Sequence, residues 1–145
     1  MADEDPANEE GKGLGSMKIR DFTITDEFVS VNTSIPCREL AKKLLEVPKG
    51  VIFLLNDQGV PVGAITAREF LIAIVKEVAL QDMKGEDLMN TNIMEIDVDD
   101  PIAEVLLKIS KNAPYAVVVK STDGSFLGYF SPKDYHEALQ RTGVL

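Results

Sequence analysis

Two short motifs carry the side chains best suited to chemistry in this chain of 145 residues. Each places a hydroxyl residue three positions before a carboxylate, Thr66 before Glu69 and Ser131 before Asp134. At the start of a helix, the hydroxyl and the free backbone N–H groups can hold an anion such as phosphate. The carboxylate can accept hydrogen bonds from both hydroxyl groups of a ribose, as the acid of dinucleotide-binding folds does. The same spacing is also a capping box, in which the two side chains satisfy N–H groups of their own helix.

The two motifs belong to an internal repeat. Residues 28–70 overlay residues 93–135 without a gap when the chain is shifted by 65 positions. The shift pairs identical residues at five places: Pro36 and Pro101, Glu39 and Glu104, Lys43 and Lys108, Gly59 and Gly124, and Gly63 and Gly128. A duplicated unit builds one structural element twice and leaves a seam between the copies. We therefore expect two related clefts at that seam, each with one of the motifs.

Each copy predicts the same order of elements, which is strand, helix, strand, strand and helix. In the first copy these are expected over residues 28–31, from about 36 to 48, 51–55, 62–65 and 67–80. In the second they are expected over residues 93–98, 101–111, 116–120, 126–130 and from the cap at Ser131 onward. Upstream of each copy, Asp21-Phe22 echoes Asp87-Leu88 with a change of one residue in register. A unit of about 60 residues buries little surface alone, so an α+β fold with two units packed sheet to sheet is expected.

The composition excludes several classes of protein. The net charge is −9; five of the 24 acidic residues and one of the 15 basic residues lie within 1–16, so the rest of the chain keeps a charge of −5. An acidic surface repels phosphate backbones, which argues against nucleic-acid binding. No apolar run approaches the roughly 20 residues that cross a bilayer, and no secretory signal is recognisable. We predict a cytoplasmic protein with a flexible acidic tail at 1–16 and repeats at 17–80 and 81–145.

The predicted helix at 67–80 is apolar on nearly every side. Its apolar residues are Phe70, Leu71, Ile72, Ala73, Ile74, Val75, Val78, Ala79 and Leu80. A helix of this kind is expected to be buried on more than one side. One side can pack on its own sheet, and the others need either the second repeat or another copy of the protein. We predict a homodimer, with burial entirely within the monomer as the alternative.

The pattern resembles the cystathionine-β-synthase (CBS) domain, and residues 17–141 resemble a tandem CBS pair, or Bateman module. The family's motif is a glycine, two apolar residues, Thr or Ser, two variable residues and Asp. It matches Gly63-Ala64-Ile65-Thr66-Ala67-Arg68-Glu69 after the turn Asn56-Asp57-Gln58-Gly59, and Gly128-Tyr129-Phe130-Ser131-Pro132-Lys133-Asp134 after the turn Ser121-Thr122-Asp123-Gly124. The resemblance implies two β-α-β-β-α repeats packed sheet to sheet with pseudo-two-fold symmetry.

The resemblance also implies a function. Such pairs bind adenosine-containing ligands between the repeats, among them AMP, ADP, ATP, S-adenosylmethionine and methylthioadenosine. They sense or regulate without catalysing, and commonly dimerise into a disc of four repeats. AMP is the ligand expected here on family grounds, with no catalytic cofactor, and the identity of any regulated protein partner stays open.

Site residues follow from the resemblance residue by residue. For the cleft of Asp134, they are Ser131 and Lys133 with Val29, Lys49, Gly50 and Val51 of the other repeat. For the second cleft, they are Thr66, Arg68 and Glu69 with Met94, Tyr115 and Ala116. Tyr115 could stack on an adenine. Glu69 departs from the family's aspartate, and its longer side chain suits capping, so ribose binding is favoured at Asp134.

Purely structural roles are the alternative for several of these residues. Core packing explains Val29 and Met94 equally well, and Lys49 and Arg68 also suit a solvated surface. A ligand-free dimerisation or protein-interaction module is the alternative function, favoured by Glu69 and by the acidic surface.

An enzyme or a metal site is not predicted. His136 and Cys37 are the only residues of their types, which leaves no cluster with metal-ligand spacing and no plausible nucleophile–base pair. The acidic group of Asp97, Asp99 and Asp100 falls where the start of a helix favours negative charge.

Overall fold

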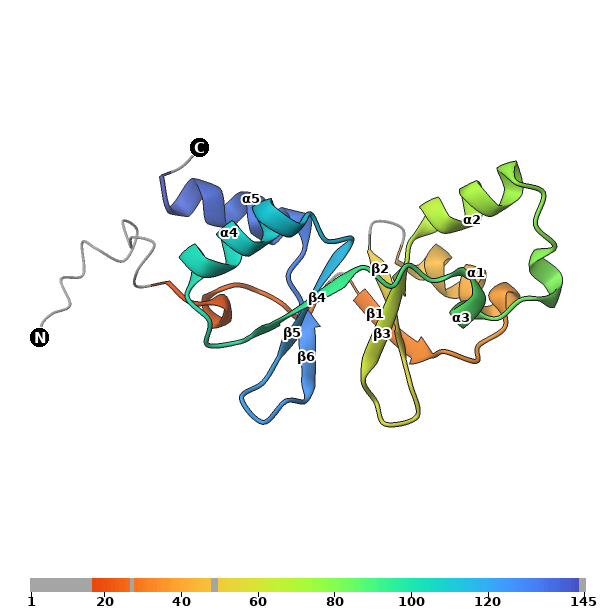
Figure 1. The fold of residues 1–145 in the computed structure, drawn as a ribbon, viewed down its shortest axis with the longest axis horizontal. Helices are drawn as coiled ribbons and strands as arrows, with labels where there is room; N and C mark the ends of the chain where they lie inside the picture. Colours follow the sequence, from red (N-terminus) through yellow and green to blue (C-terminus); the bar gives the residue numbers. More distant parts are fainter. Residues whose placement is uncertain (1–16, 27, 48–49, 144–145) are drawn as a thin grey trace, which may run out of the picture.

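The computed structural model describes residues 17–26, 28–47 and 50–143 (Figure 1). The first repeat contains β1 (Phe28–Asn32), α1 (Cys37–Glu46), β2 (Val51–Leu55), β3 (Pro61–Ile65) and α2 (Ala67–Val75). The second contains β4 (Ile93–Asp97), α4 (Ile102–Asn112), β5 (Ala116–Lys120), β6 (Phe126–Tyr129) and α5 (Pro132–Arg141). Short helical turns at Ile19–Asp21 and Leu80–Asp82, and the short helix α3 (Gly85–Leu88), lie outside this plan. The predicted β-α-β-β-α order is confirmed in both repeats.

The two sheets have the same topology. β1 pairs parallel with β2 and β2 antiparallel with β3, just as β4 pairs parallel with β5 and β5 antiparallel with β6. Even the irregularity recurs, because the antiparallel register shifts at Leu54/Leu55 in one sheet and at Val119/Lys120 in the other. The duplication seen in the sequence is therefore a duplication of strand register as well.

The sheets pack on each other through equivalent faces. The inter-sheet core consists of pairs related by the shift of 65: Val51 and Ala116, Phe53 and Val118, Ala64 and Tyr129, with Phe28 and Ile93 at its margin. Phe53 lies at its centre, with its ring centroid 5.4 Å from that of Tyr129 and 5.6 Å from that of Phe126. The helices cover the outer faces, α1 to α3 on one side and α4 and α5 on the other (Figure 1). This arrangement is the predicted sheet-to-sheet packing with pseudo-two-fold symmetry.

The segment before β1 packs on the second repeat. Met17, Ile19, Phe22 and Ile24 are buried in one cluster with side chains of α4, β5 and α5. A backbone hydrogen bond also links the segment to the second sheet, because Tyr129 donates its N–H to the carbonyl of Ile24 at 2.7 Å. Correspondingly, Leu88 and Met89 pack on the helical side of the first sheet. Each packing unit thus takes a segment from the other side of the predicted boundary at residues 80 and 81.

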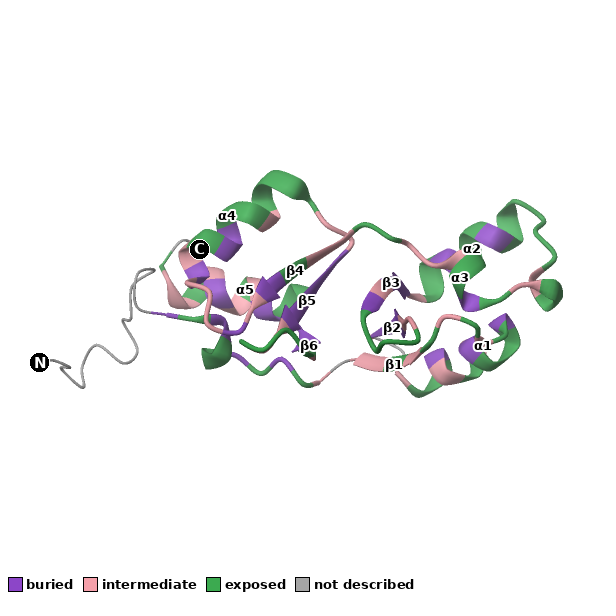
Figure 2. Cartoon of the chain, turned by 60° about the horizontal axis from the view of Figure 1, so that its bottom comes forward, coloured by how far each residue is buried: buried purple, intermediate pink, exposed green. Residues whose placement is uncertain are grey.

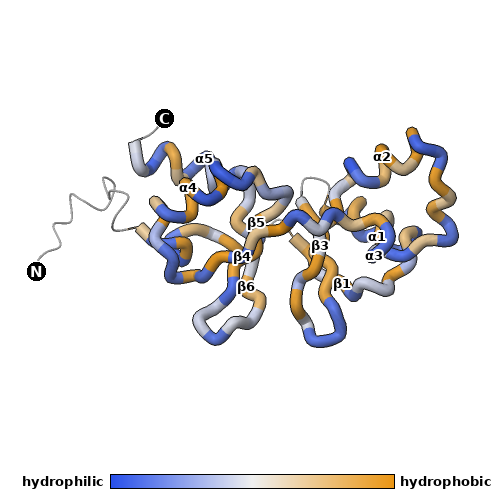
Figure 3. Tube along the Cα trace, in the orientation of Figure 1, coloured by the Kyte–Doolittle hydropathy of each residue, from blue (hydrophilic) through white to orange (hydrophobic). Residues whose placement is uncertain are grey.

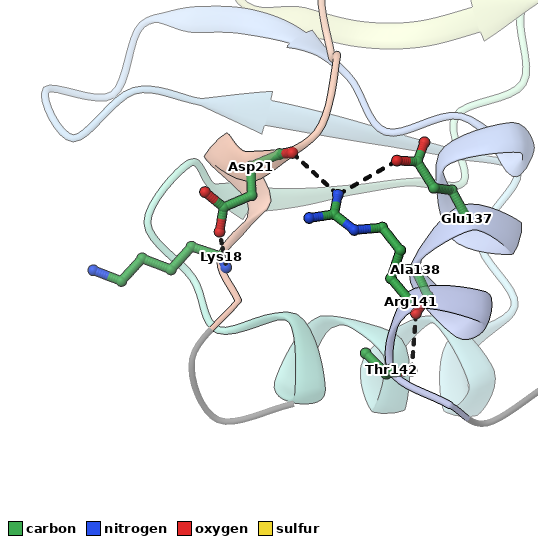
Figure 4. A network of polar contacts seen from close by, with 6 residues as sticks. All are labelled: Lys18, Asp21, Glu137, Ala138, Arg141 and Thr142. Carbon is green, nitrogen blue, oxygen red and sulfur yellow. Dashed lines mark hydrogen bonds and ion pairs between the residues drawn. The ribbon is translucent and has the colours of Figure 1, made fainter. Parts of the chain in front are cut away.

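Figure 4 shows how α5 holds this segment. The Arg141 guanidinium donates to the carbonyl of Asp21 and to the Glu137 carboxylate, in both cases at 3.4 Å. It also lies 4.8 Å from the centroid of the Phe22 ring. Phe22 in turn meets Phe130 edge to face, with centroids 5.8 Å apart. Aromatic and cationic contacts therefore converge on Phe22, and a hydrogen bond holds the backbone of its neighbour Asp21.

Helix α2 differs from the prediction. It ends at Val75 instead of near residue 80, and Glu77 adopts a left-handed φ of 58° that cannot continue the helix. Its outer face is exposed, with Leu71 at 63%, Ile74 at 62% and Val75 at 81%. Figure 2 shows α2 as largely exposed, and Figure 3 shows hydrophobic residues along much of it. Burial of this helix within the monomer, the alternative raised by the sequence, is wrong. One chain leaves the face uncovered.

Candidate functional site

The Ser131/Asp134 motif forms the head of α5. Ser131 occupies the position before the helix and Pro132 its first turn, where the missing N–H costs nothing. The Asp134 N–H donates to Ser131 Oγ at 3.1 Å, and the N–H and hydroxyl of Ser131 donate to Asp134 Oδ2 at 3.0 and 3.1 Å. Both side chains are buried, with Asp134 only 3% exposed. These bonds form a capping box.

The Thr66/Glu69 motif forms the head of α2 in the same way. Glu69 Oε1 accepts the N–H of Thr66 at 2.8 Å and its hydroxyl at 3.2 Å. Glu69 is 8% exposed. The sequence prediction that the longer acid suits capping is confirmed.

Tyr115 connects the second repeat to this box. Its hydroxyl donates to Glu69 Oε1 at 2.5 Å and lies 2.7 Å from Thr66 Oγ1. Burial, together with the hydrogen bond to Glu69, raises the pKa of the Tyr115 phenol above its usual value. The hydroxyl therefore stays protonated near neutral pH and can remain a donor to the carboxylate. The structure thus shows a polar contact across the seam that the sequence did not predict, and stacking of this ring on an adenine remains a prediction.

Three of the other predicted residues lie at the starts of the buried strands. Val51 opens β2 and Ala116 opens β5, and both are buried in the inter-sheet core. Gly50 directly precedes Val51, and its N–H donates to the carbonyl of Val47 at 2.9 Å. Lys49 lies outside the described residues. The shift of 65 pairs Gly50 with Tyr115, so the same backbone position has no side chain in one repeat and a tyrosine in the other.

Val29 and Met94 are the second residues of β1 and β4. Val29 packs with the cluster around Leu40 and Ile52, and Met94 packs with the cluster of the second repeat's helices. Because side chains alternate along a strand, their neighbours Phe28 and Ile93 turn toward the inter-sheet core instead. Their adenine contacts remain a prediction.

Arg68 and Lys133 are the second residues of α2 and α5, and both are exposed. The Arg68 N–H donates to Thr66 Oγ1 at 3.2 Å, which keeps its backbone within the cap. Both cations therefore stand one residue before the carboxylate of their box. Contact with a phosphate remains a prediction for each.

A cavity of about 190 Å³ lies beside Ser131. Its lining includes Ile109, Pro114, Tyr115 and Tyr135, so one wall is the ring whose hydroxyl reaches the other motif. Sequence reasoning missed Ile109 and Tyr135. Tyr135 follows Ser131 by four residues, a spacing that places both on one face of a helix and could have identified it.

A larger groove of about 480 Å³ runs along α2 beside Glu69. Its other walls include Ile72, Lys76, Asp87 and Thr91, which belong to α2 and to the segment that follows it. Tyr115, Ala116 and Met94 are not among its lining residues. The groove therefore approaches Glu69 from a direction other than the seam that the sequence predicted.

The described residues contain no group of three His, Cys, Asp or Glu side chains arranged to hold a metal ion. Within the acidic group, Asp100 accepts the N–H of Asp97, Asp97 accepts the N–H of Asp99, and Asp99 pairs with Arg20 at 2.6 Å. Cys37 is buried, and burial raises the pKa of its thiol. Among the residues that the structure describes, no helix has the length and apolar character needed to span a membrane.

The family model of the CBS domain matches the chain twice, over residues 19–76 and 85–141. No curated protein matches the chain in sequence.

Several solved structures share the fold. An uncharacterised protein from Pyrococcus horikoshii is 25% identical with a TM-score of 0.69, and the match covers 86% of this chain and 92% of that one. A CBS-domain protein from Pyrobaculum aerophilum, complexed with AMP, is 20% identical with a TM-score of 0.70, over 89% and 100% of the two chains. The CBS-domain pair of protein MJ0100, in complex with 5′-methylthioadenosine and S-adenosyl-L-methionine, is 20% identical with a TM-score of 0.69, over 86% and 96%.

Proposed function

The chain belongs to the CBS-domain family, as a tandem pair of CBS domains, and we propose that it is a regulatory or sensor module for an adenosine-containing ligand. The ligand binds between the repeats at the head of α5. The observation that carries this proposal is the buried Asp134 carboxylate beside Ser131, in the repeat that keeps the family's aspartate. Neighbours of the same fold hold AMP, methylthioadenosine and S-adenosylmethionine, which supports this class of ligand.

The head of α5 suits the parts of such a ligand. The Asp134 carboxylate accepts hydrogen bonds from the ribose hydroxyls, while Ser131 and the first-turn N–H groups favour a phosphate. The helix end contributes about 0.3–1 kcal/mol toward an anion, and Lys133 adds a positive charge one residue away. These local groups have to overcome the net charge of −9, so we propose AMP ahead of a triphosphate.

Regulation follows from the location of the ligand between two repeats. A ligand that touches both repeats stabilises one relative arrangement over another in proportion to its difference in affinity for the two. We propose that this changes how the module associates with a protein partner and that no catalysis is involved. Cytoplasmic location stays a prediction.

Isothermal titration with AMP, ADP, ATP, methylthioadenosine and S-adenosylmethionine tests the proposal. We expect heat with at least one of them, and Asp134→Ala to weaken the best ligand by about tenfold or more, as for a lost hydrogen bond to a charged group. Glu69→Ala is the matched control, because it removes the same capping acid from the other repeat and should leave affinity within about twofold. Silence with all five ligands, or equal losses in both variants, would reject the proposed site.

A homodimer is the second part of the proposal. The exposed apolar face of α2, formed by Leu71, Ile74 and Val75, is the feature that supports it. Helix α5 has no such face, and its residues at the equivalent positions are His136, Leu139 and Gln140. An apolar patch confined to one repeat suits a symmetric contact between two copies of that repeat. If the protein were a ligand-free interaction module, this contact would persist unchanged whatever nucleotide is added.

A further inference from the structure

The Glu69 carboxylate already has a hydroxyl partner from the opposite repeat. Tyr115 donates to Oε1 at 2.5 Å, and Thr66 Oγ1 lies 2.7 Å from the same phenol oxygen. A ribose hydroxyl bound at this box would make the same kind of bond to the same carboxylate. The Tyr115 hydroxyl therefore occupies the position that a ribose hydroxyl would take beside Glu69. Its side chain belongs to the second repeat, which a ligand in this cleft would also contact.

The duplication supplies an internal comparison. Equivalent pairs fill the inter-sheet core from both repeats, so we expect the residue opposite the Asp134 box to be the one equivalent to Tyr115. That residue is Gly50, which has no side chain to offer. By this symmetry, Gly50 is the residue expected opposite the Asp134 box, whereas Tyr115 contacts the Glu69 box.

We propose that Tyr115 is an internal ligand of Glu69 that closes the first cleft, and that the residue at the 50/115 pair decides which cleft accepts an adenosine-type ligand. The second half of this inference rests on the proposed function. Glycine at position 50 keeps the Asp134 cleft open, and tyrosine at position 115 fills the other. The module then binds one ligand per chain, although its fold contains two equivalent boxes.

Exchanging the two residues tests the selection. Gly50→Tyr should weaken binding of AMP or methylthioadenosine at least tenfold. The control Ser110→Tyr adds the same ring at an exposed position of α4 and should change binding by less than about threefold. Tyr115→Gly combined with Glu69→Asp gives the first cleft both features of the second, and should raise the stoichiometry from one to two ligands per chain. Titration calorimetry gives affinity and stoichiometry together, and circular dichroism confirms that each variant folds.

The tie itself is tested without any ligand. In a double-mutant cycle of Tyr115→Phe and Glu69→Ala, urea unfolding should reveal a coupling of about fivefold or more in the unfolding constant. The control cycle pairs Tyr115→Phe with Asp87→Ala. Asp87 is the capping acid of α3, and its Oδ2 accepts the N–H of Lys84. This second cycle should be additive within about twofold.

The outcomes separate the two proposals. Two ligands per wild-type chain, or full binding by folded Gly50→Tyr, would overturn the selection while leaving the proposed function intact. If Gly50→Tyr does not fold, the stoichiometry of the Tyr115→Gly/Glu69→Asp variant decides, and a value of one overturns the selection. No binding by wild type rejects the proposed function, in which case the Tyr115/Glu69 cycle still supports or overturns the tie.

Discussion

Replacing Phe22 by alanine should destabilise the protein strongly, although this residue lies far in sequence from the core that it completes. The ring is only 6% exposed, meets Phe130 edge to face and lies under the Arg141 guanidinium. Truncating a buried phenylalanine to alanine costs about 3–5 kcal/mol, which includes the loss of such ring contacts. With an m-value of about 2 kcal/mol/M, a loss of about 4 kcal/mol lowers the urea midpoint by about 2 M.

Leu88 provides the matched comparison, because Asp87-Leu88 is the counterpart of Asp21-Phe22 in the other repeat. Leu88 is only partly buried, so Leu88→Ala should cost about 2 kcal/mol, at the lower end of leucine truncations. Thr23→Ala, at an exposed position of the same segment, should leave the midpoint almost unchanged. A midpoint for Phe22→Ala equal to that of Thr23→Ala would refute the conclusion that residues 17–24 belong to the core of the second repeat.

Two further predictions concern the seam and the outer face. The raised pKa of the Tyr115 phenol means that the folded chain holds this proton more tightly than the unfolded chain, so its contribution is complete below pH of about 10 and is lost as pH rises through the folded pKa. Above that pH, the free energy of unfolding measured with urea should therefore fall less steeply with pH for Tyr115→Phe than for wild type. Parallel falls in the two proteins would contradict a buried hydrogen bond between Tyr115 and Glu69. On α2, Val75→Glu should convert a dimer to a monomer in sedimentation velocity, while Gln140→Glu, at the equivalent place on α5, should not. Identical sedimentation of the two variants would remove α2 from the interface.

The sequence was sufficient for the fold because the duplication doubles every signal. A single apolar run such as residues 51–55 can be read as a strand or as part of a helix, but its recurrence 65 residues later between the same turn residues leaves one plan that suits both copies. The two capping boxes followed from spacing alone, since a hydroxyl and an acid three residues apart satisfy a helix start regardless of what surrounds them.

Helix ends and segment exchange were not predictable in the same way. The apolar pattern continues through Val78 and Leu80, so nothing local signals that α2 stops at Val75 and that Glu77 turns left-handed. The echo of Asp21-Phe22 in Asp87-Leu88 identified two equivalent segments, yet it did not say that each packs on the other side of the boundary between the repeats. That choice depends on which core has room for Phe22, a property of the assembled fold.

The contact of Tyr115 with Glu69 was beyond sequence reasoning for a related reason. Whether a side chain at the start of β5 reaches the head of α2 depends on how closely the sheets approach, and that distance is set by the whole inter-sheet core. Pattern analysis could place Tyr115 at the seam, but could not show that its hydroxyl reaches Glu69.

The asymmetry between the clefts has a mechanical consequence. The contact between Glu69 and Tyr115 restrains the repeats at one edge of the seam. On our proposal, Gly50 lies at the edge near Asp134 and offers no equivalent side chain. Any motion that a ligand induces between the repeats is then expected to pivot about the tied edge and to be largest at the open one. Differential affinity for open and closed arrangements would therefore act through Asp134 alone. Cutting the tie with Tyr115→Phe should loosen the pivot even in a chain whose ligand-binding residues are untouched.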